Sequence, residues 1–194
     1  LAVLGCVIGG ITVTGLNPDS QQGDKVILDI LKRCGGKFKP VEGGLHFDRS
    51  LLKATEIDLA DCPDLGPILF TLGCFCSGET VIRNAGRLRL KESDRIEAMQ
   101  TELRKMGARI EVDGDTVHIQ GVALHAPNAP LSGHNDHRIV MALAVAAIAS
   151  GLPALLCGAE AVDKSWPAFW SVLRGLGAKV ELNTDKQEEF DIKA

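Results

Sequence analysis

The chain has 194 residues, of which 45% are hydrophobic and 24% are charged, and its formal net charge at pH 7 is −4. A chain of this length and hydrophobicity can bury one substantial core, which excludes an intrinsically disordered protein. The net charge provides no overall attraction to nucleic acid or to an anionic membrane, so an anion would have to be bound by a local cluster of cations.

The first apolar stretch, residues 1–16, follows no basic segment, which argues against a signal peptide. Both this stretch and residues 139–157 are interrupted by glycine, and each falls short of the ~20 clean apolar residues that a membrane-spanning helix needs. The first residue is Leu1 rather than Met, which suggests that the chain begins inside a longer parent. Six scattered cysteines form no CxxC pair, so we expect reduced, mostly buried thiols and a cytoplasmic location.

One local pattern, a helix end followed by a strand, occurs three times along the chain. The copies read LKRCGGKF, LRKMGARI and LRGLGAKV, and they begin at Leu31, Leu103 and Leu173. Subtraction of these numbers gives separations of 72 and 70 residues. Each copy has a glycine at its fifth position, which suits the left-handed residue that ends a helix. These glycines are Gly35, Gly107 and Gly177.

A complete unit reads strand, helix, strand, helix, strand, strand. In the middle copy we expect these elements at 55–61, 64–77, 80–84, 93–106, 108–112 and 116–120, with a hairpin turn at Asp113-Gly114. The chain starts inside the first helix of the first copy, which therefore lacks its opening strand. We predict a single domain of three repeat units, at about 1–48 (incomplete), 49–120 and 121–194.

The segment 139–149 (IVMALAVAAIA) is apolar almost all round, as a helix in the middle of a domain requires. Three such units cannot each bury their helices alone, so we expect them to pack around a shared helical core. The predicted fold class is α/β, an inside-out arrangement of repeated βαβαββ units with buried helices and outer sheets.

Basic side chains stand where predicted helices begin, although the positive end of the helix dipole disfavours them there. Lys91 and Arg95 flank one helix start, His137 and Arg138 open another, and Lys164 precedes a third. A bound phosphate or carboxylate shared between them would turn this cost into a gain. Neutralisation by neighbouring acids is the alternative. These acids are Glu92, Asp94, Asp136 and Asp163.

The run RLRLK adds further cations just before one of these helices. An extended backbone would put Arg87, Arg89 and Lys91 on one side and Leu88 and Leu90 on the other. The pattern then predicts a one-sided basic strip, although a solvated sheet edge would look the same.

Asp64 lies between two prolines at the transition from a strand to a helix. Taken alone, it is most simply interpreted as a helix cap or an acid in the first turn of the helix. His46, His118 and His125 lack the spacing of metal ligands, so we assign them no chemistry.

Three sequence features together are similar to the EPSP synthases of the enolpyruvyl transferase family. They are the string NAGRLRLKESDRIEAMQTELRKMGARIEV, the string GHNDHRIVMALAVAA, and the pair Asp163-Lys164 before an aromatic helix. The likeness extends from the QGD element at Gln22 to the strand near Val180. The resemblance implies two domains of three repeats each, with the active site between them.

The resemblance also implies a reaction, the transfer of the enolpyruvyl group of phosphoenolpyruvate to the 5-hydroxyl of shikimate 3-phosphate with release of phosphate. This is a step of aromatic amino acid biosynthesis, and the family uses neither a metal nor an organic cofactor. By matching position, Asp64 would hold the hydroxyl and act as its base, and Lys91 would support it. Glu92 would exchange a proton with the methylene carbon, and His137 would assist. The anion clamp would consist of Arg95, Arg138 and Lys164.

The amino-terminal half of the family supplies further contacts to both substrates, and nothing in these residues resembles it. We therefore expect this chain alone to fold but to be inactive or nearly so, because one wall of the site is missing. Two alternatives stay open at this point. One is the related transferase that acts on UDP-N-acetylglucosamine, and the other is a non-catalytic binding module of the same fold.

Overall fold

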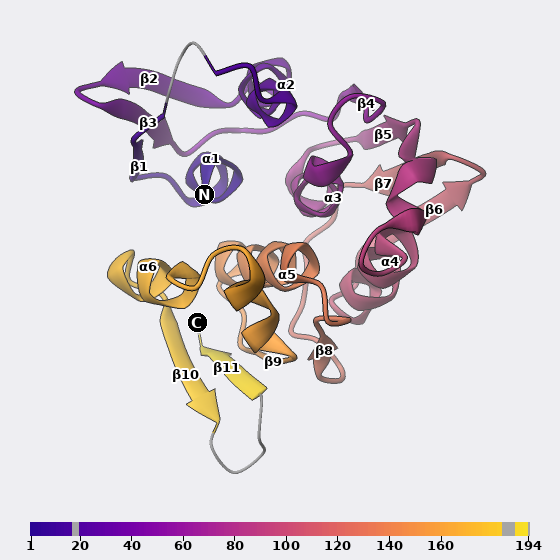
Figure 1. Ribbon diagram of the computed structural model, residues 1–194. Coiled ribbons are helices and arrows are strands. Elements are labelled where there is room, and N and C mark those ends of the chain that lie inside the picture. Colours follow the sequence, from indigo (N-terminus) through magenta and orange to yellow (C-terminus); the bar gives the residue numbers. More distant parts are fainter. Residues whose placement is uncertain (17–19, 184–188, 194) are drawn as a thin grey trace.

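The computed structural model describes residues 1–16, 20–183 and 189–193. Three sheets lie on the outside of the molecule and helices fill the space between them (Figure 1). The fold class is α/β, as the sequence predicts. Within the described ranges, no helix combines the length and apolar character that a bilayer crossing requires.

The sheet from the middle of the chain has four strands in the order β4-β5-β7-β6. β4 pairs with β5 in parallel, whereas β5 with β7 and β6 with β7 are antiparallel. The hairpin at Asp113-Gly114 is present, because Asp113 pairs with Thr116 and Gly114 has a φ of 55°. The strands are β4 (Glu56–Asp58), β5 (Glu79–Arg83), β6 (Arg109–Asp113) and β7 (Thr116–Gln120).

The other two sheets follow the same plan. The last sheet has the order β8-β9-β11-β10, with β8 parallel to β9 and the remaining pairs antiparallel. The first sheet, β1-β3-β2, matches the final three strands of this order. Its strands are β1 (Ile11–Thr14), β2 (Lys37–Val41) and β3 (Gly44–Asp48). Those of the last sheet are β8 (Leu131–Ser132), β9 (Ala154–Cys157), β10 (Lys179–Asn183) and β11 (Glu189–Lys193).

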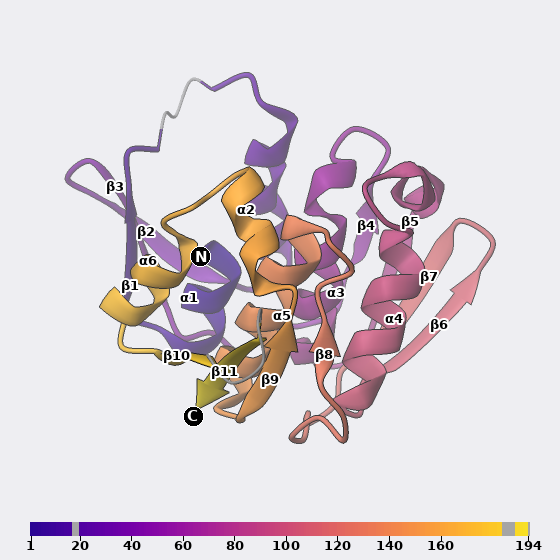
Figure 2. The same ribbon diagram turned by 60° about the horizontal axis from the view of Figure 1, so that its bottom comes forward.

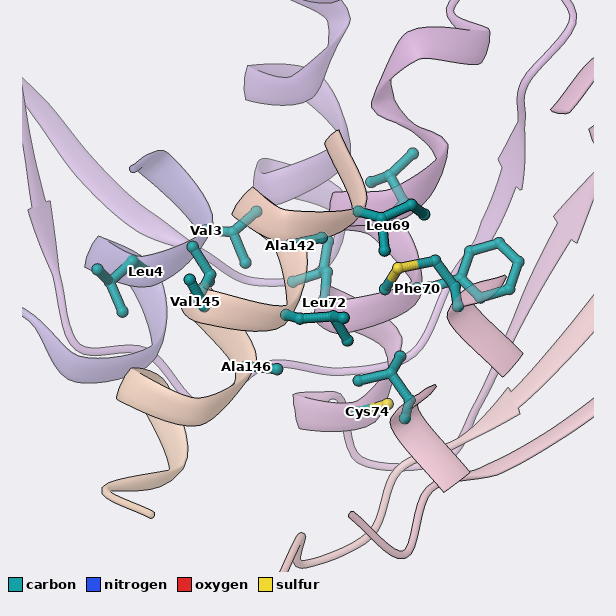
Figure 3. Close-up of a cluster of buried hydrophobic side chains, with 14 of the residues drawn as sticks. Val3, Leu4, Leu69, Phe70, Leu72, Cys74, Ala142, Val145 and Ala146 are labelled. Atoms are coloured by element: carbon teal, nitrogen blue, oxygen red, sulfur yellow. The ribbon is translucent and has the colours of Figure 1, made fainter. Parts of the chain in front are cut away.

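Three helices, α1 (Ala2–Ile8), α3 (Gly66–Phe75) and α5 (His137–Ser150), contact one another at the centre. Their side chains form the shared core, as Figure 3 shows for Val3, Leu72 and Val145. Close packing extends to the sheets, because a Cβ added to Gly5 would lie 2.6 Å from Cβ of Phe47 on β3. A larger residue at this position would therefore push α1 away from its sheet.

The outer helices are α2 (Ile27–Arg33), α4 (Arg95–Lys105) and α6 (Phe169–Gly175). Each ends shortly before one of the three glycines singled out in the sequence. Their φ angles are 83°, 88° and 93° for Gly35, Gly107 and Gly177, so the prediction of left-handed helix stops is confirmed. Only glycine adopts this conformation without steric cost.

Short 3-10 helices connect several elements, and one of them overturns a prediction. Residues 85–90 form the 3-10 helix η3 (Ala85–Leu90) rather than an extended strip. A 3-10 helix repeats every three residues, which places Ala85 and Leu88 together in the core. Leu88 is fully buried, whereas Leu90 is 87% exposed. The others are η1 (Gly23–Val26), η2 (Pro63–Leu65) and η4 (Ala159–Lys164).

The six cysteines all lie in the described ranges and form no disulfide, and each of them except Cys157 is buried. Burial raises the pKa of Cys6 to about 11 and that of Cys74 to about 12. Both thiols are therefore protonated and unreactive at neutral pH.

Candidate active site

Two lysines reach the candidate site by the same backbone path. β5 is followed by Asn84 in the left-handed conformation (φ 56°), then by η3 and Lys91. β9 is followed by Gly158 with a φ of 72°, then by η4, whose last residue is Lys164. Both lysines therefore stand at the carboxyl end of a 3-10 helix, where the backbone dipole favours a basic residue.

Asp64, in η2 at the entrance to α3, binds three cations. Lys91 Nζ lies 3.1 Å and Arg95 Nη1 3.2 Å from its Oδ1. Arg138 Nη2 lies 3.2 Å from its Oδ2. Burial by itself would raise the pKa of Asp64, but the hydrogen bond from Lys91 and the two guanidinium charges outweigh it. The pKa of Asp64 is therefore held below its ordinary value, and the group is a carboxylate at neutral pH.

Arg95 and Asp136 form a buried ion pair. Arg95 is 2% exposed and Asp136 is fully buried. The Arg95 guanidinium donates from Nε to Oδ2 at 2.7 Å and from Nη2 to Oδ1 at 3.1 Å. Ser93 Oγ donates to Oδ2 at 3.1 Å, and the backbone N–H of Arg138 donates to Oδ1 at 2.9 Å. Asp136 thus caps α5 and holds Arg95 in place. Burial would raise the pKa of Asp136, but these donors lower it below its ordinary value.

Glu92 faces His137 and Lys164. Its Oε1 lies 3.2 Å from His137 Nδ1, and its Oε2 lies 3.5 Å from Lys164 Nζ. Lys164 is held more tightly by Asn135, which accepts from Nζ through its backbone oxygen at 2.5 Å and through Oδ1 at 3.0 Å. Lys164 is therefore aimed by Asn135 and only loosely paired with Glu92.

Side-chain atoms of Glu92, Asp136 and His137 lie within 4.8 Å of one another, a spacing that metal ligands can have. Asp136 already faces the Arg95 guanidinium, and Glu92 already faces Lys164. Because a cation stands beside each carboxylate, the arrangement suits an anion better than a divalent metal ion. These contacts also connect Asp64 with Glu92. Arg95 pairs with both Asp64 and Asp136, and Asp136 lies close to Glu92 and His137.

All seven residues expected from the sequence meet in this cluster. Arg95 begins α4, and His137 and Arg138 begin α5, so the prediction of basic side chains at helix starts is correct for these three. It is wrong for Lys91 and Lys164, because each stands at the carboxyl end of a 3-10 helix, η3 or η4, and α4 and α6 begin only later, at Arg95 and Phe169. The remaining members are Asp64, Lys91 and Glu92.

Sequence reasoning missed three contributors. Asp136 was recognised only as a cap or neutralising acid, and Asn135, beside it in NDHR, was given no role. Asp24, in the QGD element, lies in η1 with its Oδ2 3.9 Å from Nη1 of Arg138. Burial raises the pKa of Asp24, Arg138 opposes the rise, and the charge of Asp64 adds to it. The available signal was that Asn135 and Asp136 stand in the string NDHR and Asp24 in the QGD element, but no spacing rule linked residues this far apart in the chain.

The charges of the cluster balance. Four cations, Lys91, Arg95, Arg138 and Lys164, face four carboxylates, Asp24, Asp64, Glu92 and Asp136. The longest contacts are those of Lys164 with Glu92 at 3.5 Å and of Arg138 with Asp24 at 3.9 Å. An incoming anion would compete most easily for Lys164, because its contact with Glu92 is long, whereas Arg138 is also paired with Asp64 at 3.2 Å.

A sequence model of the family described as EPSP synthase (3-phosphoshikimate 1-carboxyvinyltransferase) matches residues 1–173. The chain belongs to the EPSP synthase family. A family member from Clostridium acetobutylicum, named 3-phosphoshikimate 1-carboxyvinyltransferase, is 44% identical over 176 residues, which is 91% of this chain and 40% of that protein. One of the same name from Methanocaldococcus jannaschii is 40% identical over 173 residues, covering 89% of this chain and 40% of that protein.

Solved structures agree with this family membership. EPSP synthase from Acinetobacter baumannii superposes with a TM-score of 0.74 at 25% identity, covering 89% of this chain and 43% of that one. The enolpyruvyl transferase NikO from Streptomyces tendae shares the fold, with a TM-score of 0.73 at 22% identity and coverage of 92% and 41%. The chain thus spans about two fifths of the length of the family members it matches.

Proposed function

We propose that this chain is the carboxy-terminal part of a 3-phosphoshikimate 1-carboxyvinyltransferase. The enzyme would transfer the enolpyruvyl group of phosphoenolpyruvate to the 5-hydroxyl of shikimate 3-phosphate and release phosphate. The observation that carries the proposal is the convergence of two carboxylates, Asp64 and Glu92, with four cations in one cluster. Two separate proton transfers to and from an anionic substrate need this combination.

In this proposal Asp64 accepts the proton of the shikimate hydroxyl, and Lys91 supports the same hydroxyl. A carboxylate whose pKa is depressed is a weak base, so the cations around Asp64 must loosen before it can act. An anionic substrate would recruit Arg138 and part of the charge of Lys91, and the pKa of Asp64 would then rise. The base would therefore gain strength only when the substrate is bound.

Glu92 would exchange the second proton with the methylene carbon of phosphoenolpyruvate. His137, whose Nδ1 lies 3.2 Å from one of its oxygens, is the proposed supporting residue. Arg138 and Lys164 would bind the phosphate and carboxylate groups after giving up their weaker pairings with Asp24 and Glu92.

Arg95 would contribute to the same clamp from a fixed position. It uses three of its five N–H donors on Asp136 and Asp64, which leaves two for a substrate oxygen. Because its planar fork is held on two sides, little side-chain entropy would be lost when an anion binds. No metal or organic cofactor is part of the proposal.

We also propose that the chain is one domain of three repeat units, 1–48, 49–120 and 121–194. The proposal is supported by the common strand order of the three sheets, each of which lies within one of these ranges. The other partner would be the amino-terminal half of the same enzyme, which would form the second wall of the active site and exclude water.

The test is an assay of phosphate release in which this chain is fused to the amino-terminal half of the Clostridium acetobutylicum relative. We expect turnover with phosphoenolpyruvate and shikimate 3-phosphate, none with UDP-N-acetylglucosamine, and little or none from the chain alone. The control is the same amino-terminal half fused to its own carboxy-terminal half.

Two outcomes would contradict the proposal. One is an active control beside a well-folded but inactive fusion. The other is robust turnover by the isolated chain, because a half-site would then suffice. Glu92→Gln in the fusion separates catalysis from simple binding, since a proton donor loses turnover and keeps affinity, whereas a binding surface would show little change in either.

A further inference from the structure

Glu102 is a buried carboxylate that no proposed catalytic step uses. It lies on α4 and is 1% exposed, although charged side chains are rarely buried this completely unless they are paired. Its Oε2 accepts from Lys105 Nζ at 2.7 Å and from the backbone N–H of Ser132 at 2.8 Å. Its Oε1 lies 3.0 Å from Nε2 of His134. Two of its three partners therefore belong to residues 132–135, the end of β8 and the turn that leads from it to α5.

This segment has an unusual backbone. His134 and Asn135 have φ angles of 50° and 52°, in the left-handed region that non-glycine residues seldom enter. Two such residues in succession persist only where their surroundings hold them. The segment is also confined from behind, because a Cβ added to Gly133 would lie 2.4 Å from Cγ2 of Val140 on α5. Glu102 holds the same segment from α4, which lies beside β8 (Figure 2).

The two residues that follow His134 bind cations of the cluster. Asn135 binds Lys164 through both its backbone oxygen and its side chain. Asp136 binds Arg95 and caps α5. A change in the conformation of residues 132–135 would therefore move Lys164 first, because Asn135 itself lies in the strained turn.

We propose that Glu102 is a positioning residue. Through the N–H of Ser132 and the ring of His134, it holds the turn in the conformation in which Asn135 directs Lys164 toward the bound anion. The role of Lys164 in anion binding rests on the proposed function, whereas the mechanical link from Glu102 to Lys164 does not.

The test substitutes Glu102→Gln, which keeps the side-chain volume but cannot accept from Ser132, His134 and Lys105 together. Two measurements on the 194-residue chain separate the two parts of the inference. The first is the NMR signals of the Asn135 side-chain amide and of Lys164 Nζ. The second is the affinity for inorganic phosphate and for phosphoenolpyruvate, followed by titration.

We expect both sets of NMR signals to move and the affinity for phosphoenolpyruvate to fall about 10-fold, the usual effect of loosening a group that positions a ligand contact. Lys164→Met should weaken binding at least as much, and the double variant should be no weaker than Lys164→Met alone, within a factor of about 2. The matched control is Glu97→Gln, an exposed glutamate on the same helix, which should change neither measurement.

Additive losses in the double variant would overturn the proposal, because they would mean that Glu102 acts only on overall stability. Unmoved signals of Asn135 and Lys164 would overturn it as well. If the unaltered chain binds neither anion, the anion needs the second wall of the site, and the NMR signals alone decide the link from Glu102 to Lys164. If Glu102→Gln does not fold, His134→Gln carries the same test, because it removes one contact and leaves the buried charge with Lys105.

Discussion

The turns that end in Lys91 and Lys164 follow the same backbone path but deliver their ammonium groups to different partners. Lys91 pairs with Asp64 at 3.1 Å, and its side chain is 27% exposed. Lys164 is 42% exposed, binds the oxygens of Asn135, and meets Glu92 only at 3.5 Å. The repeated fold thus provides two equivalent attachment points, and neighbouring residues decide that one lysine pairs with Asp64 while the other binds Asn135.

The largest expected effect on stability comes from the buried ion pair of Arg95 and Asp136. Asp136→Ala leaves the Arg95 guanidinium buried with one partner fewer, and we expect it to lower the free energy of unfolding by about 3 to 5 kcal/mol. Urea denaturation measures this loss, with the exposed Asp163→Ala as the control. A loss below about 1 kcal/mol, the level of an exposed pair, would show that the two halves of the cluster do not depend on this pair.

The 3-10 helix η3, which leads to Lys91, can be destabilised by removing its buried apolar contact. Leu88 is fully buried against Gly66 of α3, so Leu88→Ala should cost about 2 to 5 kcal/mol of unfolding free energy. Leu90, two residues away and 87% exposed, is the matched control, and Leu90→Ala should stay within about 0.5 kcal/mol. Equal losses at both positions would mean that the segment is extended, as its alternating sequence predicts, and not a 3-10 helix.

The two lysines themselves should differ in what they control. In the fused enzyme, Lys164→Met should weaken phosphoenolpyruvate binding about 10- to 100-fold, the range of one charge-assisted hydrogen bond. Lys91→Met should act more on turnover than on this affinity, because Lys91 pairs with the proposed base. Calorimetric titration and steady-state kinetics measure the two effects. Identical profiles for the two variants would remove the distinction drawn between the turns.

Much of the fold could be predicted from the sequence, because its signals are local. A glycine at a fixed position after each of three helices predicts a left-handed residue there, and all three glycines have a positive φ. The hairpin at Asp113-Gly114 and the apolar helix at 139–149 rest on equally short-range patterns. The alternation in RLRLK gave the wrong answer because Ala85 and Leu88, three residues apart, pack into the core as a 3-10 helix.

The candidate site was predictable only where a string of residues carried the signal. Arg95 and Arg138 could be named from the strings KESDR and NDHR and Asp64 from the family resemblance, but no local pattern predicted that both arginines pair with Asp64. Glu102 gives no signal at all, because a glutamate in the middle of a helix ordinarily faces solvent. Its role depends on the path of the segment after β8, which no local pattern encodes.

The central claim is that the cations now paired with Asp64 exchange it for an anionic substrate. A carboxylate whose pKa is lower in the folded than in the unfolded chain stabilises the fold at pH values above the ordinary aspartate pKa of about 3.9. This contribution to stability is lost as the pH falls through the lower pKa of the folded chain. The most direct measurement is the ¹³C NMR titration of the Asp64 carboxyl group, free and with saturating phosphoenolpyruvate. We predict a pKa below the ordinary value in the free chain and a rise when the anion binds. An unchanged pKa in the saturated chain would contradict the account.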